Sequence, residues 1–384
     1  MSTKAADDTG YRRRVRDLCT SWQAADRYLP RSDAWLRSFD PDFSKALGAE
    51  GLIGVSWPTR YGGAGATNRD RLAVTEELLR AAAPVAAHWT ADRQVGPAIL
   101  RHGSDRLRHE LLPRICSGDI VCAIGMSEAE AGSDLASVCT TARAVPGGWL
   151  VNGRKLWTSH AHRATHIYVL ARTARMPRRQ DGLSEFVVDM ATPGITVSPI
   201  ADMTGEHHFN EVAFVDVFVP QYRLLGNQDD GWRQVTEQLS FERGGPERVL
   251  STYPLVVEIL KRAAARPADT ATAAHVGDLT ARLAALRRLC WDVAGAVDRG
   301  EVPVMEAATL KVLGTRFEQH SVELARKLGL FGEEPVDSLF WQTLLASPAF
   351  SLRGGAAEVL LDLVSRQEGG RGRDTFVHHA TAGG

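Results

Sequence analysis

The sequence lacks the cysteine pattern of a disulfide framework or a zinc site. Its five cysteines are an odd number scattered over 384 residues, and no two follow a Cys-x-x-Cys spacing. It also lacks an apolar run long enough to span a bilayer. The first eight residues are polar and lack the apolar core of a signal peptide. We therefore expect a cytoplasmic protein with no metal and no membrane association.

An excess of charge of either sign is also missing. Lysine and arginine number 45 and aspartate and glutamate 46, which gives a net charge of -1. This balance argues against nucleic acid or an anionic membrane as a partner. The small basic run Arg12–Arg14 is interpreted as a solvated helix face.

The apolar pattern changes twice along the chain and divides it into three parts. Residues 1–118 are helix-like, with prolines punctuating Ala-rich and Arg-rich stretches. Residues 119–228 are strand-like, and residues 229–384 return to apolar spacings of three and four. We predict an N-terminal helical domain, a central antiparallel β-barrel or sandwich domain and a C-terminal four-helix bundle. The tail after Gly369 is expected to be mobile.

The middle part carries the strand signals. Short segments rich in β-branched and aromatic residues occur at 167–171, 185–189 and 212–219. Turn residues at 146–148 and 152–153 predict hairpin turns on both sides of a short strand.

One segment of the middle part carries a family signature. Gly125–Ser137 reads GMSEAEAGSDLAS, and it resembles the signature of the acyl-CoA dehydrogenase family at every specified position. Four further segments occur in the family's order. They are WPTRYGG at 57–63, GPAILRHG at 96–103, VNGRKLWTS at 151–159, and VFVP followed by LLG within 217–226. The resemblance covers the chain from about residue 30 to about residue 370.

The resemblance implies a flavoenzyme with FAD as cofactor. Such an enzyme oxidises an acyl thioester between C2 and C3, and the substrate here would be an acyl-CoA or an acyl-carrier-protein thioester. Electrons would pass to an electron-transfer flavoprotein. Family members associate through the helical bundle, so we expect a homodimer or homotetramer.

The resemblance also assigns residues to the cofactor and the substrate. Ile124, Met126 and Ser127 correspond to the segment that contacts the flavin, Trp157 to the tryptophan beside its ring, and Ser159 to the hydroxyl near its reactive nitrogen. Ser133 corresponds to a serine near the pantetheine arm of the substrate. Taken singly, Trp157 would be a core residue and the serines turn residues. Because these residues occur together and in the order found in the family, we favour a role in binding the cofactor and the substrate.

The general base is the main departure from the family pattern. Removing the C2 proton needs a carboxylate within hydrogen-bond reach. Many members carry this glutamate in a late motif, where the present chain has Gly354. Isovaleryl-CoA and long-chain members place it within Leu-x-x-Glu-Arg, which matches Leu239–Arg243 here. We therefore predict Glu242 as the base, with Glu247 and Glu358 as alternatives.

Other late positions are assigned by the same resemblance. Arg243 would lie near the pantetheine or phosphates of the substrate, and the Gly354 N–H would help to hold the thioester oxygen. Glu358 corresponds to a residue near the adenosine half of the flavin. The family's Arg-x-x-Phe-Gly stretch is not recognisable, and Arg266 is the nearest candidate. Its Gln-x-x-Gly-Gly stretch is reduced to a segment containing Gly329.

Two other functions remain open at this point. The chain could be a flavin monooxygenase or a thioester lyase on the same scaffold. It could also be a non-catalytic subunit that completes a mixed oligomer.

Overall fold

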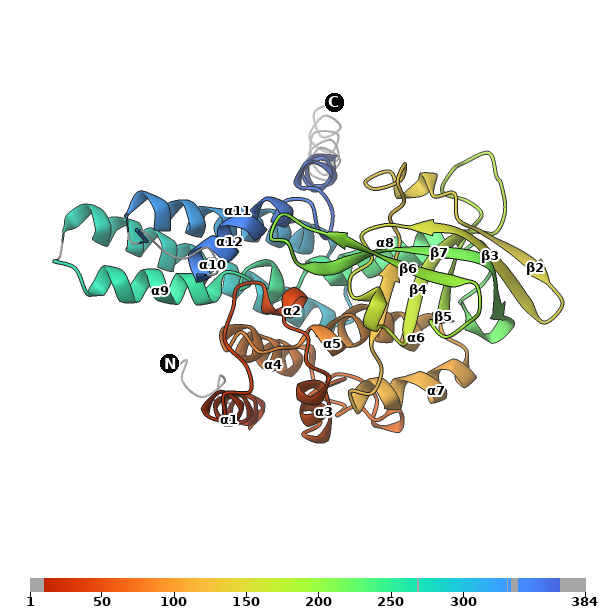
Figure 1. The fold of residues 1–384 in the computed structure, drawn as a ribbon, viewed down its shortest axis with the longest axis horizontal. Helices are drawn as coiled ribbons and strands as arrows, with labels where there is room; N and C mark the ends of the chain where they lie inside the picture. Colours follow the sequence, from red (N-terminus) through yellow and green to blue (C-terminus); the bar gives the residue numbers. More distant parts are fainter. Residues whose placement is uncertain (1–9, 268, 330, 333–337, 367–384) are drawn as a thin grey trace, which may run out of the picture.

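The computed structural model describes residues 10–267, 269–329, 331–332 and 338–366, apart from the side chains of 240–242. The C-terminal helices form an elongated bundle at one end of the molecule and the sheet lies at the other (Figure 1). The N-terminal helices run along one side of both. The tail after Gly369, predicted to be mobile, lies outside the described residues.

The N-terminal part is helical, and side chains at the helix ends satisfy free backbone groups. The Asp40 carboxylate accepts from the N–H groups of the first turn of α3, and Thr67 and Asp70 form a capping box at the start of α4. The elements are α1 (Gly10–Ala24), α2 (Ala34–Arg37), α3 (Pro41–Ala49), η1 (Thr59–Tyr61), α4 (Asn68–Arg80), α5 (Ala86–Thr90), η2 (Ala91–Val95), α6 (Gly96–His102) and α7 (Asp105–Cys116).

One helical run in this part is interrupted by a π-helix. Residues of η2 follow α5 directly and continue into α6, and the residues at both junctions keep right-handed helical backbone angles. A π-turn widens the helix locally and often occurs at functional sites. In this chain η2 carries Arg93, whose side chain is buried.

The basic run at residues 12–14 is only partly exposed, although the sequence predicted a fully solvated helix face. Arg12 is only 3% exposed, and its guanidinium donates to Glu76 at 2.6 Å and to Glu77 at 2.9 Å. A buried guanidinium needs carboxylate partners, and α4 supplies two of them. The arginines at 13 and 14 are exposed, so the interpretation was wrong for Arg12.

The central part is one eight-stranded sheet with the order β6-β7-β3-β2-β4-β5-β8, while β1 pairs with β4. The pairs are antiparallel except β1 with β4 and β2 with β4, which are parallel. The strands are β1 (Cys122–Gly125), β2 (Thr141–Val145), β3 (Gly148–Lys155), β4 (His166–Arg172), β5 (Leu183–Asp189), β6 (Ile195–Ala201), β7 (His207–Pro220) and β8 (Leu224–Leu225). Short turns η3 (Leu135–Ser137), η4 (Ala161–Arg163) and η5 (Gln221–Arg223) lie between them.

Only one of the two predicted hairpin turns in this part is present. Pro146 and Gly147 connect the antiparallel strands β2 and β3. Asn152 and Gly153 instead lie inside β3, where its pairing with β7 shifts register. A Cβ on Gly153 would lie 2.4 Å from Thr140 Oγ1. Here the glycine serves a bulge and a close approach rather than a turn.

The strand β4 is buried on both faces and holds the sheet against the helices. Ile167 and Val169 belong to the core of the sheet, whereas Tyr168 belongs to the larger core shared with the helices. All three side chains are fully buried. A near-continuous apolar strand is expected where both faces are covered.

The C-terminal part is helical again, and it packs on the N-terminal helices as well as on itself. The long helix α10 contacts both α11 and α4. The elements are α8 (Gly231–Arg243), η6 (Pro246–Arg248), α9 (Tyr253–Ala264), α10 (Thr270–Asp298), α11 (Val304–Lys327) and α12 (Leu339–Phe350), and residues 357–366 are also helical. The predicted order of helical, sheet and helical domains is confirmed. Within the described ranges, none of the helices combines the length and apolar character that a membrane crossing requires.

Candidate active site

The signature segment begins where β1 ends, and its glutamate organises the loop that follows. Glu128 accepts hydrogen bonds from the backbone N–H groups of Cys139 at 2.6 Å and Thr140 at 3.0 Å. Its side chain also pairs with Lys155 Nζ at 2.8 Å. Burial tends to raise the pKa of Glu128, but the charge of Lys155 and these hydrogen bonds outweigh it and lower the pKa. The carboxylate therefore stays ionised and closes the loop from residue 128 to residue 140.

Lys155 joins the signature to the second motif. Its side chain is fully buried, and Nζ also donates to the Met126 carbonyl at 3.0 Å. Burial lowers the pKa of Lys155 to about 8, against the opposing effect of Glu128. The next residue, Leu156, donates its N–H to the Ser127 carbonyl at 2.8 Å. The segments around 126–128 and 155–157 are thus fixed side by side.

Trp157 follows this junction and presents its ring outward. Its backbone has a left-handed φ of 59°, unusual for a side chain of this size. The indole is 56% exposed and packs edge-on against Phe209, with the ring centroids 5.7 Å apart at 86°. Next to it, Thr158 is fully buried, and its Oγ1 has no hydrogen-bond partner within the described part of the chain.

These features fit a flavin. A flavin needs a flat apolar wall for its ring and polar donors for its edges. Trp157 offers an exposed aromatic face, and Thr158 has an unsatisfied buried hydroxyl. The residues predicted to contact the cofactor, Met126, Ser127 and Ser159, are half-buried near the same junction. Ile124 is half-buried within β1, two residues before Met126.

Ser133, the predicted substrate residue of the signature, lies in an exposed loop. The neighbouring Asp134 accepts from Ser137 Oγ at 2.5 Å and from Arg179 at 3.4 Å. The loop is therefore held on one side while Ser133 remains accessible to a ligand.

The helical half of the candidate site forms where α8 ends. Glu242, the predicted base, is the penultimate residue of α8, and its side chain lies outside the described residues. Arg243 Nε donates to the Gly354 carbonyl at 3.2 Å. Two positions predicted to act in catalysis and substrate binding, 111 residues apart in the chain, are therefore in direct contact.

The loop at Gly354 leaves little room for a side chain. Its φ is +70°, and a Cβ there would lie 2.8 to 3.1 Å from the guanidinium nitrogens and carbon of Arg248. Arg248 is buried, and its guanidinium carbon lies 5.5 Å from the ring centre of Trp35. A glutamate at position 354 would therefore have to displace a packed arginine as well as adopt a strained backbone.

A buried polar network anchors the same loop. Arg353 donates to Asp33 at 2.5 Å and to Ser251 Oγ at 3.0 Å. Ser251 in turn donates its N–H to Glu318 at 2.8 Å. Burial raises the pKa of Glu318 to about 7, although the charge of Arg353 opposes the shift. Residue 354 is thus positioned from the N-terminal helices and from α11 together.

The two alternative bases differ in setting. Glu247 is 3% exposed and pairs with Arg93 at 3.3 Å, so it lies in a buried ion pair between η6 and η2. Glu358 is exposed on the helix that starts at residue 357.

The remaining two predicted cofactor residues are in contact with each other but distant from Trp157. The Arg266 guanidinium donates to the carbonyls of Leu328 at 2.8 Å and Gly329 at 2.5 Å. These residues follow α9 and α11 at the tip of the bundle, at the opposite end of the molecule from the sheet (Figure 1). A role for them at a flavin would require the site of another subunit.

Sequence reasoning did not foresee the charged groups that hold the site together. Glu128 and Lys155 occur at fixed places in two matched segments, and their opposite charges were a usable signal for a pair. Arg248, Arg353 and Glu318 had no such signal, because their contacts join distant parts of the chain.

Comparisons with known families match the three parts of the chain in order. The family models are "Acyl-CoA dehydrogenase, N-terminal domain" at residues 11–119, "Acyl-CoA dehydrogenase, middle domain" at 123–217 and "Acyl-CoA dehydrogenase, C-terminal domain" at 229–369. The three matches cover the signature, the exposed tryptophan and the loop at Gly354.

Individual relatives agree with the family models. The chain is 33% identical to acyl-CoA dehydrogenase FadE29 of Mycobacterium tuberculosis, over 84% of this chain and 86% of the relative. It is 28% identical to the mitochondrial isovaleryl-CoA dehydrogenase of Pongo abelii, over 76% and 70% of the two chains. A solved structure described as the Tcur3481-Tcur3483 steroid ACAD superposes with a TM-score of 0.81 at 26% identity, covering 94% of this chain and 97% of that one.

Proposed function

Because the chain belongs to the acyl-CoA dehydrogenase family, we propose that it dehydrogenates an acyl thioester between C2 and C3 with Glu242 as the general base. Members of the family are FAD-dependent oxidoreductases acting on CH–CH groups, and FAD is the cofactor of this chain. The prediction of the family, the fold and the cofactor is therefore confirmed, and the residue roles stay proposals.

The observation that carries the choice of base is the loop at Gly354. It holds no carboxylate, and Arg248 occupies the space that a side chain would need. Glu242 ends the helix whose next residue, Arg243, donates to the Gly354 carbonyl. A carboxylate on α8 would therefore serve the same region. The isovaleryl-CoA dehydrogenase relative, whose type carries Leu-x-x-Glu-Arg, supports this position.

In the proposed reaction, a bound FAD would supply the acceptor for the hydride from C3. Glu242 takes the proton from C2, and the charge that develops on the thioester oxygen needs hydrogen-bond donors. The Gly354 N–H has no partner within the described ranges, so it is available as one donor. Arg353, held by Asp33 and Ser251, anchors the loop from the residue before this N–H. Ser133 and Arg243 would bind the pantetheine arm.

For the cofactor, we propose that Ile124, Met126, Ser127, Trp157 and Ser159 would hold the flavin ring. The junction between Lys155 and Met126 supports this assignment because it brings the two segments together. Arg266 and Gly329 would contact the flavin of a partner subunit, since they lie at the far end of the bundle. Glu358 would lie near the adenosine half of the flavin.

We propose an acyl-CoA substrate rather than a carrier-protein thioester, and an electron-transfer flavoprotein as acceptor. The relatives named acyl-CoA dehydrogenase support the choice of substrate. A homodimer or homotetramer through the bundle is our proposed assembly, and the free cysteines support a cytoplasmic location.

A second candidate is a subunit of a mixed oligomer. The structure described as the Tcur3481-Tcur3483 steroid ACAD bears two protein names, and the bundle tip of this chain would need another subunit to reach a flavin. Size-exclusion chromatography and the flavin absorbance of the purified protein distinguish this candidate from a homo-oligomeric enzyme. A pure chain that stays colourless with added FAD, but turns yellow with a co-expressed homologue, would favour the mixed oligomer.

The proposed reaction is tested by mixing flavin-loaded protein with a panel of CoA and carrier-protein thioesters without oxygen. Loss of the oxidised flavin absorbance, with formation of the enoyl thioester, is the expected result. A panel that leaves the flavin oxidised would contradict the dehydrogenase assignment. Flavin reduction that requires oxygen, or thioester cleavage without reduction, would favour a monooxygenase or a lyase.

A further inference from the structure

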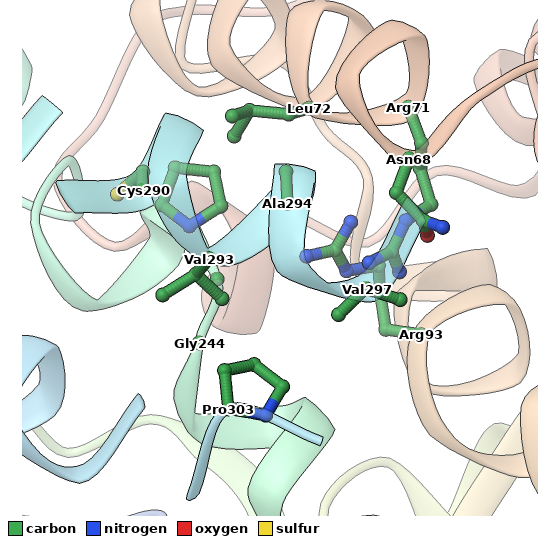
Figure 2. A pocket seen from close by; sticks show the side chains of 12 residues that line it. Asn68, Arg71, Leu72, Arg93, Gly244, Cys290, Val293, Ala294, Val297 and Pro303 are labelled. Carbon is green, nitrogen blue, oxygen red and sulfur yellow. The ribbon is translucent and has the colours of Figure 1, made fainter. Parts of the chain in front are cut away.

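The described part of the chain contains a pocket beside the end of α8. It is lined by residues of α4 and η2, by the segment that follows α8, and by α10 (Figure 2). Gly244 and Gly245 form one wall, and they come directly after Glu242 and Arg243. Its enclosed part measures about 20 Å³, and the rest is open to solvent. The enclosed part has room for about one or two water molecules, or for a carboxylate group in their place.

Two arginines give the pocket its charge. The side chains of Arg71 from α4 and Arg93 from η2 lie together at one side of it (Figure 2). Arg93 donates to Thr75 Oγ1 at 3.0 Å and to Glu247 at 3.3 Å, so its charge is balanced. The guanidinium of Arg71 makes no hydrogen bond or ion pair with any described residue, and its Nε is buried.

The neighbouring carboxylates are engaged elsewhere. Asp92 accepts from the Gly54 N–H at 2.8 Å. Asp298 accepts from the Asn68 N–H at 2.6 Å and from the Arg69 N–H at 3.3 Å, at the start of α4. Burial lowers the pKa of Arg71 to about 10, and the charge of Arg93 adds to this effect. The charges of Asp92, Glu247 and Asp298 oppose this shift, but none of these carboxylates pairs directly with Arg71 among the described residues. A buried cation without a direct partner is costly inside a protein.

The rest of the wall is apolar. It consists of Leu72, Pro246, Cys290, Val293, Ala294, Val297 and Pro303. Apolar walls that end at a guanidinium suit a ligand with a hydrocarbon body and a carboxylate at its tip. An ion without a hydrocarbon part would leave these walls unused.

We propose that this pocket receives a carboxylate at the far end of the acyl group, bound by Arg71 and supported by Arg93. The preferred substrates are then CoA thioesters of dicarboxylic acids. This inference rests on the proposed function, because Glu242 would act on C2 while the chain extends past Gly244 into the pocket. The thioester end and the acid end of the substrate would thus be bound by different parts of the molecule.

The first test compares CoA thioesters of equal length, hexanoyl with adipyl and octanoyl with suberyl, on flavin-loaded enzyme. We expect kcat/KM to favour the dicarboxylic member at least tenfold. Arg71→Met should lower this preference by about ten- to a hundredfold, the loss expected for a charge-assisted hydrogen bond. Arg71→Lys should keep part of it. Arg80→Met removes a charge from the same helix outside the pocket and should keep the wild-type ratio.

The proposal would be overturned if the wild type had nearly equal kcat/KM for the dicarboxylic and monocarboxylic thioesters. It would also be overturned if Arg71→Met and Arg80→Met lost the preference to the same extent. If Arg71→Met does not fold, the wild-type ratio and Arg71→Lys still decide. A second measurement needs no turnover. Monomethyl adipate should raise the melting temperature of the wild type more than uncharged dimethyl adipate does. This difference between the two esters should be smaller in Arg71→Lys and smallest in Arg71→Met.

This second measurement separates the two proposals. If no thioester reduces the flavin, the dehydrogenase assignment fails, and the melting experiment still reports on the pocket. Stabilisation by monomethyl adipate that depends on Arg71 supports a carboxylate site. Equal stabilisation by sodium sulfate at matched ionic strength, or no stabilisation, overturns it.

Discussion

The two halves of the candidate site are held together in different ways. On the sheet side, Lys155 contacts Glu128 and Met126, and the paired residues are 27 and 29 positions apart. On the helical side, Arg353 contacts Asp33 and Ser251, which are 320 and 102 positions away. The cofactor side is thus a local structure that a motif can encode. The proposed catalytic side is assembled from segments that are distant in the chain.

The same contrast appears in two glutamates of the site, the half-buried Glu128 and the buried Glu318. Glu128 has a lowered pKa and stays ionised, because a lysine and two backbone N–H groups share its oxygens. Glu318 has a raised pKa of about 7 because burial dominates. One half of the site is therefore built on a fixed charge, and the other on a carboxyl that titrates near neutrality.

The largest expected effect comes from the helical half. Glu242→Gln should lower the rate of flavin reduction in a single turnover by about 10²- to 10⁴-fold, because a general base contributes about that much. Stopped-flow absorbance with a thioester that reduces the wild type measures it. Flavin content should stay at the wild-type level, since the sheet side would hold the ring.

Two matched variants sharpen this result. Glu358→Gln removes an exposed carboxylate, and Glu247→Gln removes the alternative base from its ion pair with Arg93. Both should reduce the flavin much faster than Glu242→Gln does. Undiminished flavin reduction in Glu242→Gln would remove this residue from the mechanism.

The fold was predictable from sequence, and so was the proximity of the segments that form the sheet side of the candidate site, because the contacts that join these segments are local. The signature, Trp157 and Ser159 lie within one stretch of the chain, and short-range contacts such as that of Leu156 with Ser127 fix them. Asn152–Gly153 was wrongly predicted as a hairpin turn, which shows the limit of prediction from local sequence. The same dipeptide can form a turn or a bulge, and only its pairing with the neighbouring strand distinguishes the two.

The helical half was less predictable because its contacts are long-range. The sequence shows glycine at position 354 in place of the glutamate of the late motif. It does not show that Arg248 packs against this position. Arg12 was taken for a surface residue, since nothing near it in sequence indicates that Glu76 and Glu77 face it. Arg71 carried no motif at all. Its proposed role follows only from the pocket and from a buried Nε that has no hydrogen-bond partner within the described residues.

The next largest effect tests the sheet half. Lys155→Met should lower the free energy of unfolding by about 2–3 kcal/mol, because it removes the charge partner of the half-buried Glu128 carboxylate. Urea unfolding followed by circular dichroism measures this. The double variant Lys155→Met/Glu128→Gln should recover part of the loss. A loss in the double variant equal to the sum of the single losses would show that the pair does not stabilise the loop.

The smallest expected effect tests the contrast between Glu128 and Glu318 through the pH dependence of stability. Glu318 holds its proton up to about pH 7 in the folded state, whereas its ordinary pKa is 4.5. Between these values unfolding releases a proton, so its contribution to stability is full below pH 4.5 and declines as pH rises towards 7, by up to about 1.4 kcal/mol per pH unit. Glu318→Gln should remove this decline in urea unfolding at pH 5, 6 and 7. Glu323→Gln, an exposed position on the same helix, should keep it. Parallel pH profiles for the wild type and Glu318→Gln would mean that Glu318 is ionised when folded, and both halves of the site would then rest on fixed charges.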